Sequence, residues 1–146
     1  MENIADLYPD DLLQLSQRAL NFEKRPHSQH IIEAYNPVCG DKFKLYLDID
    51  NQHITQATFH GYGCVISKAA TTVLIEKLKN LTLSEAEKAI ETYFDTLNTE
   101  GVKPEGDAIF RPFLMVKKYP ERLNCATLSW QAAKNYFQIE KENLKK

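Results

Sequence analysis

Alternating apolar and polar positions predict a β-hairpin in the first half of the chain. From residue 43 to residue 49 every second side chain is apolar, and the side chains between them are charged or tyrosine. A period of two places alternate side chains on opposite faces of a half-buried strand. A polar turn at 50–53 then leads into a returning strand at 54–60. His60 falls on the opposite face from the apolar Phe59, which predicts a position at the rim or toward solvent.

Spacings of three and four residues predict helices on both sides of this hairpin. One helix begins near Thr82, because two overlapping capping boxes, Thr82 with Glu85 and Ser84 with Glu87, precede an amphipathic stripe. That stripe is expected to pack in the core and consists of Ala86, Ala89, Ile90, Tyr93, Phe94 and Leu97. The other predicted helices cover residues 8–21, 65–79, 109–119 and 125–143. Irregular loops are predicted at 21–35 and 98–107, and Pro120 is predicted to close the helix before it.

The segment Asn36-Pro37-Val38-Cys39-Gly40-Asp41 places a thiol and a carboxylate two residues apart. Pro37 fixes its own φ angle, and Gly40 can take backbone conformations that are closed to other residues. We therefore expect a tight loop rather than a helix or strand. Such a loop is able to direct both side chains toward one point.

Two further cysteines stand beside predicted helices. Cys64 follows Gly61-Tyr62-Gly63 and precedes the helix at 65–79, where free amides and the helix dipole lower the pKa of a thiol. Cys125 is predicted at or just before the first turn of the last helix. Three cysteines fit reduced thiols that act as ligands or nucleophiles better than a disulfide framework. The alternative is that they are small buried hydrophobic side chains.

The composition narrows the class of protein. With 146 residues, of which 43% are hydrophobic and 26% are charged, the chain fits one globular domain. A net charge of -2 provides no basic surface for nucleic acid. The sequence holds no apolar run as long as a membrane span, and its acidic start differs from the basic start of a secretory signal. We therefore expect a cytoplasmic protein without a membrane partner.

Three thiolates and one carboxylate form a four-ligand set that suits tetrahedral zinc, and sulfur ligands also suit an iron–sulfur cluster. The spacing of these ligands differs from that of a zinc finger, and the candidates are Cys39, Asp41, Cys64 and Cys125. His27 and His30 form a second pair with a spacing that can chelate a metal. Because irregular polar segments are usually surface loops, we predict solvated histidines there rather than a metal site.

Three motifs, each centred on a cysteine, resemble the IscU/SufU (NifU N-terminal) family of iron–sulfur cluster assembly proteins. The resemblance covers nearly the whole chain from Asn36 onward, and its motifs are residues 36–41, 61–67 and 122–128. It implies an α+β fold of the SufE/NifU type, in which a small antiparallel sheet packs against helices in a single domain over residues 1–146. It also implies that the three cysteines and the aspartate converge at one exposed end.

Within that family the chain is similar to the SufU branch. Scaffold-type members carry a histidine directly before the third cysteine and a Leu-Pro-Pro-Val-Lys motif upstream, whereas this chain has Asn124 at that position and lacks the motif. Arg122, three residues before Cys125, and the long stretch at 98–119 also resemble the corresponding parts of the SufU branch. The N-terminal pattern of the family is present only in part, as Leu7-Tyr8 and Pro26.

The SufU resemblance implies a zinc-dependent sulfurtransferase that accepts persulfide sulfur from a SufS-type cysteine desulfurase. It implies that Cys64, Cys125 and Asp41 hold the zinc while Cys39 is released as the sulfur acceptor. A desulfurase histidine then takes the vacant position on the zinc. Arg122 either supports the thiolates or the incoming persulfide, or forms a surface salt bridge.

Two other interpretations use the same residues. The first is a scaffold that assembles a transient [2Fe–2S] cluster on Cys39, Cys64 and Cys125 and passes it to downstream assembly proteins. A carboxylate in place of a fourth thiolate makes such a cluster labile, which suits transfer. The second is a purely structural zinc site, which does not require a glycine-flanked ligand loop.

Overall fold

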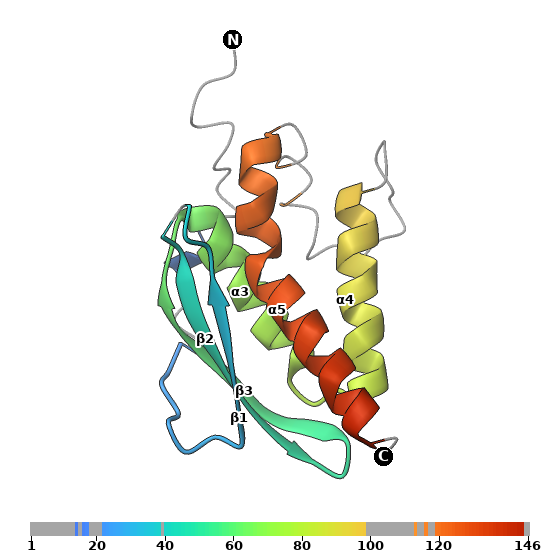
Figure 1. The fold of residues 1–146 in the computed structure, drawn as a ribbon. Coiled ribbons are helices and arrows are strands. Elements are labelled where there is room, and N and C mark those ends of the chain that lie inside the picture. Colours follow the sequence, from blue (N-terminus) through green and yellow to red (C-terminus); the bar gives the residue numbers. More distant parts are fainter. Residues whose placement is uncertain are drawn as a thin grey trace.

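The described part of the protein consists of one antiparallel sheet with helices packed on one of its faces (Figure 1). The structure, a computed structural model, describes residues 14, 16–17, 22–38, 40–98, 113, 116 and 119–144. Its elements in chain order are β1 (His30–Tyr35), β2 (Lys42–Asp50), β3 (His53–Tyr62), α3 (Val65–Leu78), α4 (Leu83–Asn98) and α5 (Pro120–Leu144). This arrangement confirms the expected α+β fold.

The predicted hairpin is present as β2 and β3. The two strands pair antiparallel, and the strand order of the sheet is β1-β2-β3. Asn51 and Gln52 connect them with φ angles of 52° and 66°, the left-handed conformation that tight hairpin turns require. The apolar set of the period-two pattern faces the helices, and its fully buried members are Phe43, Leu45 and Leu47. Alternation along the chain therefore identified both the strand and its buried face.

The prediction of an irregular loop over residues 21–35 is wrong for its second half. Residues 30–35 form β1, which pairs antiparallel with β2 and buries Ile32 and Ala34 in the core. Two buried side chains are too few to establish a period of two. The strand depends instead on its pairing with β2, which a local pattern does not reveal.

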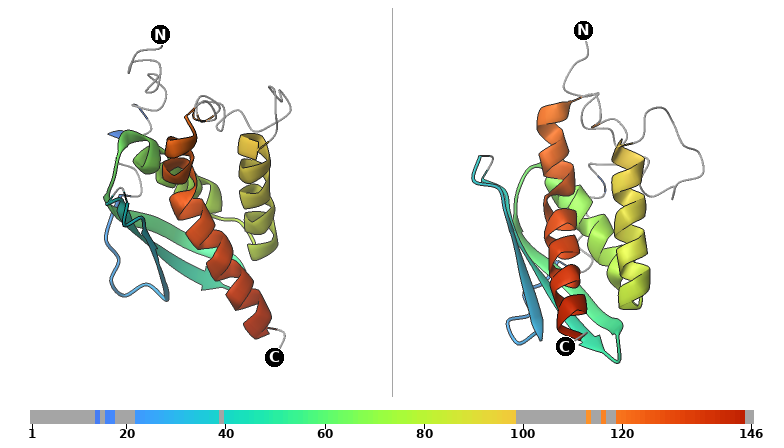
Figure 2. Two further views of the ribbon diagram at one scale, coloured as in Figure 1. Left: turned by 45° about the horizontal axis from the view of Figure 1, so that its top comes forward. Right: turned by 45° about the vertical axis from the view of Figure 1, so that its right-hand side comes forward.

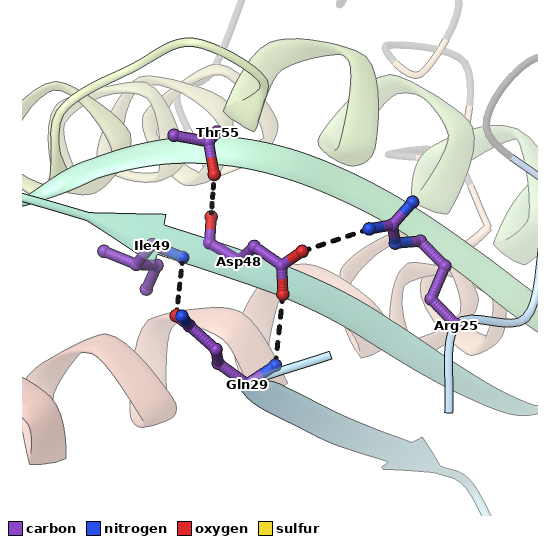
Figure 3. Close-up of polar contacts among 5 residues, drawn as sticks. All are labelled: Arg25, Gln29, Asp48, Ile49 and Thr55. Atoms are coloured by element: carbon purple, nitrogen blue, oxygen red, sulfur yellow. Dashed lines mark hydrogen bonds and ion pairs between the residues drawn. The ribbon is translucent and has the colours of Figure 1, made fainter. Parts of the chain in front are cut away.

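The segment before β1 is irregular, as predicted, and Asp48 on β2 holds it against the sheet (Figure 3). The Arg25 guanidinium lies 3.1 Å from one carboxylate oxygen of Asp48, and the Gln29 main-chain N–H donates to the other at 3.1 Å. The Ile49 main-chain N–H donates in turn to the Gln29 side-chain oxygen at 3.1 Å. These bonds fix where the chain enters β1.

The helical layer is built around α5. Helices α3 and α5 contact the sheet, and α4 packs against α5 and α3 on the side away from the sheet (Figure 2). The Tyr93 and Trp130 rings stack at 3.8 Å with an interplanar angle of 11°. The Trp130 Nε1–H also donates to the Ala70 carbonyl at 2.9 Å. Because Trp130 is fully buried, it belongs to the core and joins α3, α4 and α5.

Helix α4 begins at the first of the two predicted capping boxes. The Thr82 main-chain N–H donates to Glu85 Oε1 at 3.0 Å, and the Glu85 N–H donates back to Thr82 Oγ1 at 3.1 Å. The predicted stripe faces the core, with four members buried and two partly buried: Ala86, Ile90, Tyr93 and Leu97, then Ala89 and Phe94. The local sequence thus determines both the start and the buried face of this helix.

The predicted start of the last helix at Cys125 is wrong, because α5 begins at Pro120. Proline is favoured at the first helical position, where its missing N–H is not needed. Pro120 therefore opens this helix rather than only closing the segment before it. As a result, Cys125 lies within α5, beyond its first turn, and not at a helix N-terminus.

Other predicted elements lie largely outside the described residues. Of the helix predicted at 8–21, the described residues 14, 16 and 17 are helical. The loop at 98–107 is described only at Asn98, the last residue of α4, and the segment 109–119 is described only at Phe113, Val116 and Tyr119. Phe113 and Val116 are fully buried. Among the described helices, none combines the length and apolar character needed to cross a membrane.

Candidate metal centre

Three of the four predicted ligands meet at one point. A carboxylate oxygen of Asp41 and the Sγ atoms of Cys64 and Cys125 all lie within 4.8 Å of one another. Donor atoms around a tetrahedral zinc ion lie about 3 to 4 Å apart, so small adjustments suffice to bind one. The three residues come from the start of β2, the β3–α3 junction and α5. Cys39 lies outside the described residues, two positions before Asp41 in the sequence.

The loop before β2 is closed by three hydrogen bonds. The Asn36 N–H donates to the Asp41 carbonyl at 2.9 Å, and the Gly40 N–H donates to the Asn36 carbonyl at 2.7 Å. The Val38 N–H donates to the Asn36 side-chain oxygen at 3.0 Å. Gly40 has a φ angle of 79°, which other residues rarely adopt. The tight loop predicted from Pro37 and Gly40 is confirmed in its described residues.

Asp41 is the buried carboxylate of the centre, with 4% of its surface exposed. Its Oδ1 accepts a hydrogen bond from the Cys64 main-chain N–H at 3.2 Å. Its Oδ2 is buried and has no hydrogen-bond partner among the described residues. A buried carboxylate oxygen is costly to leave unpaired, and a bound cation removes that cost. Together with two nearby thiols, this oxygen fits a metal ion that accepts sulfur and oxygen ligands.

Cys64 caps helix α3, as its predicted place at the helix N-terminus requires. The Ser67 main-chain N–H donates to Cys64 Sγ at 3.4 Å, and the Ser67 hydroxyl donates to the Cys64 carbonyl at 3.1 Å. A hydrogen bond with the Cys125 thiol, assisted by these Ser67 contacts, lowers the pKa of Cys64 to about 6. Burial and the nearby Asp41 carboxylate act in the opposite direction. Cys64 is therefore a thiolate at neutral pH.

The lowered pKa predicts a measurable reactivity profile in the protein stripped of metal. Iodoacetamide should alkylate Cys64 at a rate that rises through pH 6 and levels off above about pH 7, because the thiolate is then about nine-tenths formed. An ordinary thiol, with a pKa of 9.0, continues to gain reactivity beyond pH 8. Mass spectrometry of the Cys64 peptide separates this rate from those of the other cysteines. A rate that still rises between pH 7 and pH 9 would contradict the assignment.

The same shift links protonation to folding. The pKa of Cys64 is lower in the folded chain than its ordinary value of 9.0, so ionisation stabilises the fold. This stabilisation is complete above pH 9 and is lost as the pH falls through about 6. Thermal melts of the metal-free protein at pH 5, where this stabilisation is lost, and at pH 9, where it is complete, measure its effect on the melting temperature.

A buried contact between helices positions the two described thiols. Thr71 on α3 and Ser129 on α5 lie 2.7 Å apart through their hydroxyl oxygens, and both side chains are buried. The Thr71 hydroxyl also lies 2.8 Å from the Ser67 carbonyl, one turn closer to Cys64. Ser129 stands one turn after Cys125. This contact fixes α3 against α5 next to the thiols, and the sequence analysis did not identify it.

Two glycines allow β3 to reach the centre. A Cβ atom on Gly61, whose φ angle is 149°, would lie 2.2 Å from the Lys42 carbonyl oxygen. One on Gly63 would lie 2.4 Å from Ser67 Oγ and 2.9 Å from the Phe43 ring. These distances are shorter than van der Waals contact, so a side chain at Gly61 would push against the β2 backbone and one at Gly63 would force Ser67 and the Phe43 ring to shift.

The remaining described candidate residues are not members of this group of ligands. His27 is exposed, and His30 on β1 is hydrogen-bonded through Nδ1 to the Tyr136 hydroxyl. His60 is half-buried on the sheet and stacks on the Phe22 ring at 4.7 Å, consistent with its predicted rim position. Arg122 lies partly buried in the first turn of α5, and its role stays a prediction. Among the described residues, Asp41, Cys64 and Cys125 are the one group of three potential metal ligands.

Comparison with known proteins identifies relatives with related chemistry. The family model NifU-like N terminal domain matches residues 20–135. The chain is 30% identical over 106 residues to the zinc-dependent sulfurtransferase SufU of Bacillus subtilis, and the match covers 70% of each chain. It is 29% identical over 119 residues to the iron–sulfur cluster assembly scaffold protein IscU of Streptococcus pyogenes, covering 76% of this chain and 74% of that protein.

Solved structures share the fold. The crystal structure of the SUF-system protein FiSufU from Fervidobacterium islandicum AW-1 matches with a TM-score of 0.82 and 26% identity, covering 94% of this chain and 98% of that one. The N-terminal part of a NifU-like protein from Brucella abortus matches with a TM-score of 0.77 and 20% identity, covering 94% of this chain and 97% of that one. The arrangement of sheet and helices is therefore the one found in SufU.

Proposed function

The chain belongs to the NifU-like N-terminal domain family, and we propose that it serves iron–sulfur cluster assembly as a zinc-dependent sulfurtransferase. The observation that carries this proposal is the meeting of two thiols with a buried carboxylate oxygen that has no partner among the described residues. The SufU relative, by its name, performs this activity. The proposed partner is a SufS-type cysteine desulfurase, and the proposed location is the cytoplasm.

The proposed roles divide the ligands into a fixed set and an acceptor. Asp41 directly precedes β2, Cys64 directly precedes α3, and Cys125 lies within α5. These residues are therefore suited to stay in place and hold the zinc. Zinc, when bound, keeps the coordinated thiols in the thiolate form at neutral pH. Cys39 belongs to the loop before β2, and we assign it the role of acceptor.

The transfer step exchanges one sulfur–sulfur bond for another. The Cys39 thiolate attacks the terminal sulfur of the desulfurase persulfide and forms a new bond to it. The old bond breaks, and its electron pair leaves with the desulfurase cysteine as a thiolate. Both sequence neighbours of position 39 are exposed, with Val38 at 91%, so the loop is open to a protein partner. Arg122 is proposed to support the anionic groups.

The proposal is tested by mixing the zinc-loaded protein with the SufS-type desulfurase and cysteine. We expect faster alanine formation by the desulfurase and about one added sulfur on the Cys39 peptide in mass spectrometry. Cys39→Ser should retain part of its zinc, because three ligands remain, but should lose the acceleration. If Cys39→Ser accelerates the desulfurase as the unmodified chain does, Cys39 is not the acceptor.

A scaffold for a [2Fe–2S] cluster is the second candidate function, favoured by the match to IscU over a similar share of the chain. The cluster is then cargo, bound by the three cysteines and passed to downstream assembly proteins. Anaerobic incubation with iron and the desulfurase distinguishes the two. A stable iron–sulfur absorption spectrum without any persulfide on Cys39 would favour the scaffold over sulfur transfer.

A further inference from the structure

The two edges of the sheet differ in how they are covered. The outer edge of β3 is hydrogen-bonded at two places, where the Glu23 N–H donates to Phe59 O at 2.8 Å and the Ile54 N–H donates to Leu81 O at 2.8 Å. β1 forms the other edge of the sheet. Its outer side has no main-chain hydrogen bond to any of the described residues. Proteins usually cover or shorten such edges, because an open edge can pair with another chain.

The register shows which groups of β1 face outward. The Asn36 N–H donates to the Asp41 carbonyl, and the pairing continues from there without a shift to His30 and Leu47. In an antiparallel pair the hydrogen-bonded residues alternate, so Ala34 and Ile32 direct their main-chain groups toward β2. The main-chain groups that face outward belong to Ile31, Glu33 and Tyr35. These residues offer a row of donors and acceptors to an added strand.

A groove runs between this edge and α5. Its volume is about 640 Å³, and its apolar lining includes Ile31, Tyr35, Leu128, Tyr136 and Ile139. Three of these side chains are strongly exposed, Ile31 at 42%, Tyr35 at 56% and Ile139 at 55%. β1 and α5 lie side by side (Figures 1 and 2). An open edge strand beside a helix is the arrangement in which PDZ and PTB domains bind an extended peptide as an additional strand.

The groove leads to the metal centre. Asn36 and Pro37 line one end of it, and they belong to the loop that carries Asp41 and the proposed acceptor. Asn124, which directly precedes Cys125, lines it from α5. A segment bound along β1 therefore extends to the thiols. A partner that reacts at these thiols must cover this end of the molecule. The groove continues from there along β1, so such a partner can occupy the groove and the metal centre at the same time.

We propose that the outer edge of β1 and the groove beside α5 bind an extended segment of the cysteine desulfurase as a fourth strand of the sheet. The identity of this partner rests on the proposed function. The bound segment pairs through its main chain with Ile31, Glu33 and Tyr35 and places apolar side chains at alternate positions in the groove. The only charged side chain in this outward row is Glu33, which is already paired with Lys44 at 3.8 Å.

The first experiment measures amide hydrogen exchange of the zinc-loaded protein with and without the desulfurase. The amides of Ile31, Glu33 and Tyr35 should exchange at least about tenfold more slowly in the complex. The amides of Ile32 and Ala34, already bonded to β2, provide the internal comparison. Unchanged exchange at the three outward amides in a saturated complex would overturn the proposal.

The second experiment compares Glu33→Pro with Glu33→Ala by calorimetric titration with the desulfurase. Both variants lose the ion pair with Lys44, but only the proline removes the outward N–H, which the sheet itself does not use. Glu33→Pro should bind about tenfold more weakly than Glu33→Ala. Ile139→Glu, on the α5 side of the groove, should also weaken binding. Melting curves and zinc content show whether each variant is folded. If Glu33→Pro does not fold, amide hydrogen exchange in the unmodified chain decides whether the edge of β1 binds the desulfurase.

The outcomes separate this proposal from the proposed function. Tight binding with protected β1 amides but no persulfide on Cys39 would preserve the docking surface and reject sulfur transfer. Persulfide on Cys39 with unprotected β1 amides would support sulfur transfer and reject the docking surface. Protection of the same amides that rises with protein concentration in the absence of desulfurase would mean that a second copy of the chain occupies the edge, which overturns the assignment of the partner.

Discussion

Replacing both Cys64 and Cys125 with serine is expected to abolish zinc binding. The Sγ atoms of these residues and a carboxylate oxygen of Asp41 lie within 4.8 Å of one another, so the double variant removes two of the three described ligands at once. A serine hydroxyl stays protonated at neutral pH and is a poor zinc ligand, whereas Cys64 is already a thiolate there. Elemental analysis should find about one zinc per chain in the unmodified protein and none in the double variant.

Metal removal tests the same ligand assignment through the melting temperature of the protein. Because zinc binds the folded state, a chelator should lower the melting temperature of the unmodified protein. The stabilisation that is lost grows with the ratio of free zinc to its dissociation constant and is about 4 kcal/mol at a thousandfold excess. The double variant should melt at the same temperature with and without chelator. Full zinc occupancy in Cys64→Ser/Cys125→Ser would show that the metal is held elsewhere.

Elements of the fold that depend on neighbouring residues were predictable from the sequence. The capping box at Thr82 and Glu85 fixes the start of α4, and the period of two fixes the inner face of β2, because each signal acts over a few residues. β1 escaped prediction because its stability comes from pairing with β2. The start of α5 was misplaced because proline both ends one segment and opens the next, and the local sequence does not separate the two roles.

The candidate site, like the fold, could be predicted from the sequence only in part. The motifs singled out Asp41, Cys64 and Cys125, which the structure brings within 4.8 Å of one another, and Cys39, which lies outside the described residues. They did not reveal that Oδ2 of Asp41 is buried without a partner among the described residues, which is the structural observation that favours a cation. They also gave no indication that Thr71 and Ser129 join the helices beside the thiols. Contacts between residues far apart in sequence require the folded structure.

The interface between α3 and α5 thus connects the core to the metal centre. Cys64 caps α3, and Cys125 lies within α5, so the distance between their sulfur atoms depends on how these helices pack. Trp130 is the largest fully buried side chain among the described residues. It stacks on Tyr93 at 3.8 Å, and its Nε1–H donates to the Ala70 carbonyl on α3 at 2.9 Å.

Trp130→Ala is therefore expected to destabilise the fold and to weaken zinc binding together. Truncating a fully buried tryptophan should lower the free energy of unfolding by about 3 to 5 kcal/mol, through lost contacts and the cavity that remains. Trp130→Phe should keep much of the stack on Tyr93 while losing the bond to Ala70, so its cost should be smaller, about 1 to 3 kcal/mol. Urea unfolding of the metal-free proteins, followed by circular dichroism, measures both.

Tyr35→Ala provides the control, because Tyr35 is an aromatic residue on β1 with 56% of its surface exposed. It should change the free energy of unfolding by less than about 0.5 kcal/mol. Competition with a zinc chelator then measures the dissociation constant of each folded variant. Weaker zinc binding in Trp130→Phe than in Tyr35→Ala would show that helix packing determines the spacing of the thiols. Equal zinc affinity in these two variants would mean that the ligand loops position the thiols independently of the core.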